Sequence, residues 1–248
     1  MALVPAAPAT YQAYVLDFEI IPRALRPRQK ARVHFYVREP HMHATVRRFE
    51  LVHERPFHLF IVSHDLDYFT HIHPTLRPNG ALDVEVEVPR PGVYQMIADF
   101  LPTGGPPQLI QKSFATAGYL GELAAIPRLV PDAADKILRG TRVKLTMPEA
   151  VAGREQLITF DMQDEVSGTP VRDLQPYLGA TGHLLLASSD LAIAAHSHPV
   201  AEISALGGPT VVFQVLFPRG GDYRLWAQFQ RHGEVLTASF NVPVKGRY

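Results

Sequence analysis

The chain has 248 residues, of which 46% are hydrophobic and 19% are charged, a composition typical of a globular domain. Lysine plus arginine and aspartate plus glutamate number 24 each, so net charge gives the chain no attraction to nucleic acid. The sequence has no cysteine, which excludes disulfides, thiol nucleophiles and cysteine metal ligands. No apolar run approaches the ~20 residues that a membrane-spanning helix needs.

The first half of the chain predicts a series of short strands separated by turns. Apolar and polar residues alternate most clearly at residues 32–38 (RVHFYVR) and 82–88, without a convincing helical period. The expected strands lie at residues 11–19, 32–38, 46–51, 57–63, 68–73, 82–88, 93–100 and 109–114. Such a run of short strands is typical of an antiparallel β-sandwich of the immunoglobulin-like type.

One stretch of the sequence occurs twice. Residues 57–74 (FHLFIVSHDLDYFTHIHP) and residues 182–199 (GHLLLASSDLAIAAHSHP) both contain the pattern H-x12-H-x-H-P. The sequence therefore predicts two domains, at residues 11–117 and 141–246, joined by a linker at 118–140 with a weakly helical stretch at 132–138. The expected fold class is all-β, with two tandem immunoglobulin-like or cupredoxin-like antiparallel β-sandwich domains.

The repeated stretch reads as a hairpin that brings three histidines together. If its turn centres on the Asp-Leu pair, His58 lies opposite His73 and residue 60 lies opposite His71. Opposed residues share a face, as do residues two apart on a strand, so the three imidazoles project from one side. Such a set suits Cu(II), Zn(II) or Ni(II). A shift of one residue in register would break the site. The same reasoning selects His183, His196 and His198 in the second copy.

Other residues of the first domain are weaker candidates. His41, Met42 and His43 offer imidazole and thioether ligands, and the thioether would suit Cu(I). Asp99 is a candidate fourth ligand or a partner that orients an imidazole, although its counterpart Gln228 is a poor replacement for an anion and an ordinary polar residue at a strand end is the simpler reading. Five histidines lack a counterpart in the second domain, and either enrich the first site or lie on the surface: His34, His41, His43, His53 and His64.

Four segments carry a resemblance to a known group of proteins: FTHIHP, RPGVY, AHSHP and YRLWAQF. Together they resemble a repeat in bacterial secreted or periplasmic proteins of poorly defined function, often found near metal-handling proteins. The likeness covers most of both domains, with Ala194 and Asp99 departing from the pattern. It implies an extracytoplasmic β-sandwich and no established activity. A looser similarity, in fold and ligand chemistry alone, is to copper-carrying β-sandwiches of the periplasmic copper-resistance type.

These observations predict a metal-binding protein that stores, buffers or delivers a transition metal. Copper is the expected ion and zinc the alternative, with one three-histidine site in each domain. A redox or hydrolytic enzyme at an open three-histidine site, or an interaction module without metal, are the alternatives; no catalytic residue is expected, because no acid, base or nucleophile accompanies the histidines. The expected partners are the metal ion and a protein that exchanges it, with neither nucleic acid nor a membrane span. A periplasmic or secreted location is expected although residues 1–10 lack a signal peptide.

Overall fold

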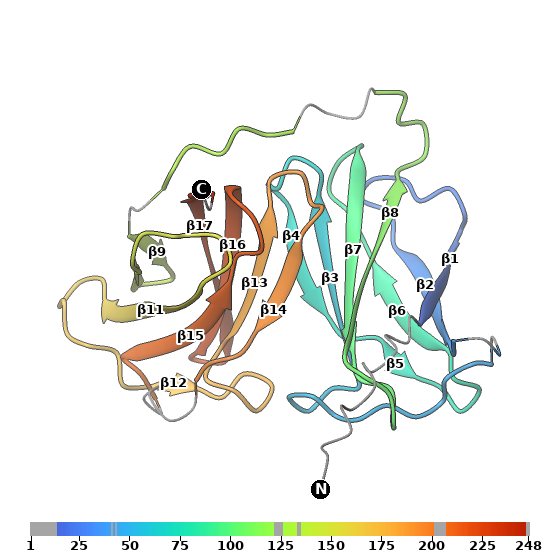
Figure 1. Cartoon of the computed structure of the whole chain (residues 1–248), viewed down its shortest axis with the longest axis horizontal. Helices are drawn as coiled ribbons and strands as arrows, with labels where there is room; N and C mark the ends of the chain where they lie inside the picture. Colours follow the sequence, from blue (N-terminus) through green and yellow to red (C-terminus); the bar gives the residue numbers. More distant parts are fainter. Residues whose placement is uncertain are drawn as a thin grey trace, which may run out of the picture.

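The computed structural model describes residues 14–40, 42, 44–121, 126–132, 135–200 and 207–246, and within them the chain is all-β (Figure 1). None of the described residues forms a helix long and apolar enough to cross a membrane. The strands of the first sandwich are β1 (Val15–Ile21), β2 (Ala31–Arg38), β3 (Phe57–Ser63), β4 (Phe69–Ile72), β5 (Thr75–Leu76), β6 (Leu82–Val86), β7 (Val93–Phe100) and β8 (Gln108–Ala115). Those of the second are β9 (Lys136–Leu138), β10 (Thr141–Thr146), β11 (Glu155–Asp164), β12 (Leu174–Gln175), β13 (His183–Ser188), β14 (Ala194–Ser197), β15 (Thr210–Leu216), β16 (Gly221–Arg231) and β17 (Glu234–Val244).

The first sandwich has the strand arrangement of an immunoglobulin-like domain. One sheet has the order β1-β2-β6-β5 and the other β4-β3-β7-β8, which correspond to the A-B-E-D and C′-C-F-G sheets of that fold. Strands β3 and β7 occupy the residues that the sequence predicted. The strand expected at residues 46–51 is wrong: Phe49 makes only an isolated bridge to Pro102, which has no N–H with which to extend a ladder.

The second sandwich repeats this arrangement with additions. Its sheets have the orders β15-β11-β10-β9 and β12-β16-β13-β14, and β17 pairs with β16. The added strand β9 pairs with β10 from within residues 118–140, where the sequence indicated a linker. The short helix expected at 132–138 is therefore wrong over residues 136–138, which are extended; residues 133 and 134 lie outside the described part of the chain.

A buried tyrosine marks the same corner of each sandwich. The hydroxyl of Tyr94 donates a hydrogen bond to the carbonyl of Arg90 at 2.8 Å, and that of Tyr223 donates to the carbonyl of Arg219 at 3.1 Å. A tyrosine at the start of strand F that bonds back to the chain a few residues upstream is a hallmark of immunoglobulin-like sandwiches. This bond and the strand order agree with the predicted fold class.

The two sandwiches meet through their C′-C-F-G sheets, so β3, β4, β13 and β14 lie in the middle of the molecule (Figure 1). Alternate residues of β3 point to opposite faces: Leu59 and Ile61 enter the core of the first sandwich, whereas Phe60 and Val62 pack against the second. The buried residues of this interface cluster are Phe60, Val62, Leu66, Ile97, Leu129, Leu185, Ala187, Leu191 and Trp226. The histidine-bearing faces of both hairpins therefore turn toward each other.

Candidate metal centre

The first hairpin has the register that the three-histidine site requires. Strands β3 and β4 are antiparallel with Phe60 opposite His71, which confirms the predicted turn centre. In the turn, Ser63 Oγ donates to Asp65, whose carboxylate also accepts the Asp67 amide. Leu66 has φ of 65°, which costs a non-glycine residue about 1 kcal/mol. Its side chain is fully buried in the interface cluster, and this burial offsets the strain by about 2 kcal/mol.

The second hairpin repeats these features. Leu185 lies opposite His196, so β13 and β14 keep the register of the first hairpin. Ser188 Oγ donates to Asp190 at 2.6 Å, and Leu191 takes φ of 55° with its side chain buried in the same interface cluster. The turn therefore fixes which face the histidines occupy in both domains.

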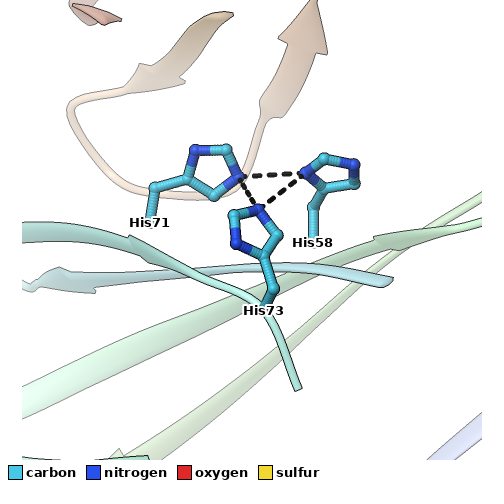
Figure 2. A group of neighbouring side chains, drawn as sticks. All are labelled: His58, His71 and His73. Carbon is cyan, nitrogen blue, oxygen red and sulfur yellow. Dashed lines mark hydrogen bonds between the residues drawn. The ribbon is translucent and has the colours of Figure 1, made fainter. Parts of the chain in front are cut away.

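The first histidine set brings three ring nitrogens together (Figure 2). His58 Nδ1 lies 3.0 Å from His71 Nε2 and 3.3 Å from His73 Nε2, and the last two nitrogens are 3.1 Å apart. Two imidazoles bound to one ion through bonds of ~2.0–2.1 Å have nitrogens ~2.9–3.4 Å apart for angles between 90° and tetrahedral. The set thus has the spacing of a coordination sphere.

The second set is built from the equivalent residues. His183 Nδ1 lies 3.3 Å from His196 Nε2. The ring of His198 lies beside that of His196, with centroids 4.3 Å apart, and His198 Nε2 is buried without a hydrogen-bond partner among the described residues. This nitrogen is the counterpart of His73 Nε2, which completes the first set.

Hydrogen bonds on the far side of each ring fix which nitrogen carries the proton. His58 Nε2 donates to the carbonyl of Val52 at 2.9 Å, and His183 Nε2 donates to that of Tyr177 at 3.0 Å. Because a carbonyl oxygen only accepts, the Nδ1 atom of each neutral ring carries a lone pair.

The remaining supports cross between the sandwiches. His71 Nδ1 donates to Gln228 Oε1 at 2.8 Å, and His196 Nδ1 donates to Asp99 Oδ2 at 2.7 Å. Gln228 Nε2 in turn donates to Thr237, which holds the amide with its oxygen toward His71. Each sandwich thereby orients a histidine of the other, and the Nε2 atoms of His71 and His196 face the centre with their lone pairs.

Burial keeps these rings neutral. It lowers the pKa of His73 and of His183 to about 3, and it lowers the pKa of His71 and of His196 well below the usual value of histidine, with neighbouring histidines adding to the effect. Burial also raises the pKa of Asp99 to about 6, so this carboxylate is ionised above that pH. Around neutral pH the four supported rings therefore direct lone pairs at the centre, an arrangement that a cation stabilises.

The two sets form one six-histidine cluster: His58, His71, His73, His183, His196 and His198. Ring centroids of His58 and His196 are 5.1 Å apart, and those of His71 and His183 are 5.5 Å apart. Two triads are close enough to hold a metal ion, His58 with His71 and His73, and His58 with His183 and His196. The sequence predicts one site in each domain, whereas both sets lie side by side at the interface.

The other candidates fall in different places. Asp99 contacts the cluster as a support of His196. Met42 is 78% exposed, and His41 and His43 lie outside the described residues. Of the histidines without a counterpart, His34 pairs with Asp83 away from the cluster, whereas the ring of His53 stacks on that of His198 with centroids 3.6 Å apart.

Three contributors to the cluster were not predicted from the sequence: Gln228 as a support, and Val52 and Tyr177 as carbonyl acceptors. Gln228 was discounted because it lacks the negative charge of Asp99. The property that the two side chains share is an oxygen atom that accepts a hydrogen bond from a histidine. Tyr177 stands 125 residues after Val52, the same offset as the histidines, so the repeat itself carried that signal.

One protein family matches both halves of the chain. It is described as a domain of unknown function, DUF8832, and it matches residues 11–114 and again residues 135–246. The chain belongs to the DUF8832 family. Each match to DUF8832 contains one complete hairpin with its three histidines. No curated protein matches the chain.

Several solved structures are similar to this DUF8832 chain in fold. FetP of uropathogenic E. coli strain F11 shares 11% identity over 48% of this chain and 97% of FetP, with a TM-score of 0.35. A tetra-tandem repeat from the extending region of a large adhesion protein shares 11% over 94% of this chain and 50% of that one, with a TM-score of 0.32. A two-domain fibronectin type III segment of chicken tenascin shares 11% over 92% and 97%, with a TM-score of 0.24.

Proposed function

We propose that this chain binds transition-metal ions at the six-histidine cluster, with copper as the physiological ion, and that it stores, buffers or delivers them. One observation carries the proposal. Four imidazoles donate their N–H groups to acceptors on the far side of the ring and direct their lone pairs at each other in pairs: His58 with His71 across 3.0 Å, and His183 with His196 across 3.3 Å. Two facing acceptors repel unless a cation lies between them.

The chemistry of the ligands supports copper before zinc. Neutral imidazole binds both ions, and copper(II) exceeds zinc(II) in affinity for a given nitrogen site. The chain offers no cysteine to favour a structural zinc site. Zinc is the alternative ion, and competition between the two metals decides between them.

The burial of the cluster supports storage, buffering or delivery over turnover. His58 and His183 are each 1% exposed and the side chain of His196 is also 1% exposed. A reacting substrate needs an open coordination position, whereas a stored ion benefits from exclusion of water. A periplasmic or secreted location and a partner protein that exchanges the ion complete the proposal, and both are motivated by the sequence resemblance.

Titration of the metal-free, tag-free protein with copper and with zinc tests the proposal. We expect copper to bind tightly and His58→Ala to weaken binding at least about 100-fold, because loss of a ligand exceeds the 10–100-fold effect of losing an outer partner. The matched control is His232→Ala, an exposed histidine paired with Asp173 outside the cluster, which leaves binding unchanged. Equal binding by the wild type and the His58 variant would overturn the proposal.

A further inference from the structure

Each histidine set has its own complement of ring nitrogens. In the first set, His58, His71 and His73 direct three nitrogens at one point (Figure 2). In the second set, His183 and His196 converge, and His198 Nε2 is buried with no partner within the described residues. A buried nitrogen without a partner calls for a proton donor or an ion. His58 belongs to both triads that lie close enough to hold an ion, so a second ion would be held by His183 and His196 with His198 in place of His58.

Ions in the two sets would lie close together. The ligand nitrogen of His58 lies within 4.8 Å of those of His183 and His196. With metal–nitrogen bonds of about 2 Å, the two ions are at most about 9 Å apart. No protein layer separates them, because the rings of the two sets are in direct contact. Each ion would therefore experience the charge of the other.

The surroundings supply little negative charge for such a pair. Among the described residues, Asp99 is the carboxylate that accepts a hydrogen bond from a histidine of the cluster. The positive charge of Arg55 acts on His58 and His73. Two divalent ions with Asp99 leave three uncompensated positive charges, whereas two monovalent ions leave one. Repulsion between divalent ions is also about four times that between monovalent ions at the same separation.

We propose that the six-histidine cluster holds two copper(I) ions as a dinuclear centre between the sandwiches, with the second histidine set as the stronger position. This inference rests on the proposed function and adds the number and charge of the ions. The positions differ because the anion Asp99 supports His196, whereas the neutral amide of Gln228 supports His71. A carboxylate behind a coordinating histidine makes the imidazole a stronger donor.

Stoichiometry and stepwise affinity of the full chain test the number of ions. Metal-free protein is titrated anaerobically with copper(I) against a chromophoric chelator, and separately with zinc(II). We expect two copper(I) ions per chain. The references are two single-set variants, one with His71→Ala and His73→Ala, the other with His196→Ala and His198→Ala.

Comparison with these references isolates the repulsion between the ions. We expect the second zinc(II) ion to bind to the wild type at least about 100-fold more weakly than one zinc(II) ion binds to the corresponding single-set variant. For copper(I), we expect the same comparison to give a loss of affinity of less than about 10-fold. One copper(I) ion per chain, or two zinc(II) ions with the single-set affinities, would overturn the dinuclear centre and leave the proposed function standing. Binding of neither metal would overturn both.

The supports are tested as positioning residues. Asp99→Asn should lower the copper(I) affinity of the second set about 10-fold, and Gln228→Glu should raise that of the first set about 10-fold. Each is measured in the background that retains only the set concerned. A purely structural role for Asp99 would lower the affinity of both sets alike, and that result would overturn the assigned difference between the two positions.

Discussion

His196 Nδ1 donates a hydrogen bond to Asp99 Oδ2 across 2.7 Å, although the two residues are 97 positions apart and belong to different sandwiches. Removing the acceptor leaves a buried N–H group without a partner, so we expect Asp99→Ala to lower the free energy of unfolding of the metal-free protein by about 1–3 kcal/mol. Asp99→Asn keeps an acceptor oxygen and removes a carboxylate whose pKa is raised to about 6 by burial. This variant should match or exceed the stability of the wild type.

Urea unfolding at pH 8 with a chelator measures these differences. The control is Asp17→Ala, an exposed partner of Arg38, with an expected cost below about 1 kcal/mol. An Asp99→Ala protein as stable as the wild type would show that the bond to His196 contributes nothing to docking of the two sandwiches.

Trp226 stabilises the contact between the sandwiches. The residue is 3% exposed, and its ring stacks on that of Phe69 with centroids 5.1 Å apart. We expect Trp226→Ala to cost about 3–5 kcal/mol and to split thermal unfolding into two transitions, as the sandwiches lose their common core. Calorimetry checks both effects. Leu157→Ala, at a position 48% exposed on β11, is the control and should keep a single transition.

Ser63 holds the turn that sets the register of the first hairpin. Its Oγ donates to Asp65 and accepts the amide of Tyr68 at 2.9 Å. We expect Ser63→Ala to cost about 1–2 kcal/mol, because the buried hydroxyl of Ser63 makes both of these turn bonds. Ser188→Ala should have a similar effect in the second hairpin, where Ser188 Oγ donates to Asp190.

Ser113→Ala is the matched control for these turn variants, since that exposed hydroxyl donates to Gln95 away from the turn. Chemical unfolding gives the comparison. If all three serine variants are equally stable, the turn does not depend on the hydroxyl bonds.

The metal-free protein should lose stability as the pH falls below about 6.5. Burial lowers the folded-state pKa of His73 and His183 to about 3, whereas an unfolded histidine titrates near 6.5. The unfolded chain therefore binds more protons between these limits, and each such histidine contributes a slope of up to about 1.4 kcal/mol per pH unit. Asp99 has a folded-state pKa raised to about 6, so its protonation stabilises the folded state as the pH falls below 6. This one group opposes the loss of stability that the buried histidines cause.

Urea midpoints between pH 8 and pH 5, measured with a chelator, check this dependence. His232→Gln removes an exposed histidine and should leave the slope unchanged. Midpoints that stay constant over this interval would mean that the buried histidines titrate normally.

The register of each hairpin could be predicted because the chemistry that sets it is local. The Asp65 turn and the spacing of His71 from His58 lie within one stretch, and a second copy of that stretch supports the same alignment. The strand at residues 46–51 failed for a non-local reason, since Phe49 meets a proline 53 positions away, at residue 102.

The meeting of the two sets was not predicted, although β3 carried a sign of it. A strand with one exposed face alternates apolar and polar residues, whereas Phe57–Ser63 is apolar at nearly every position and buried throughout. The face of Phe60 and Val62 therefore needed a cover, which the second sandwich provides. An orienting role for Asp99 was one of the expected alternatives, but its partner His196 in the other sandwich followed from that docking, and the role of Gln228 had no local signal.

The exchange of supports between the sandwiches makes the assembly of the centre an intramolecular event. Both partners of the His71–Gln228 bond and of the His196–Asp99 bond belong to one polypeptide, so their encounter occurs at the high effective concentration of tethered domains. Separated domains would have to find each other by diffusion. If the chain were cleaved between the domains, the measured metal affinity would depend on the protein concentration. The metal affinity of the intact chain does not depend on it.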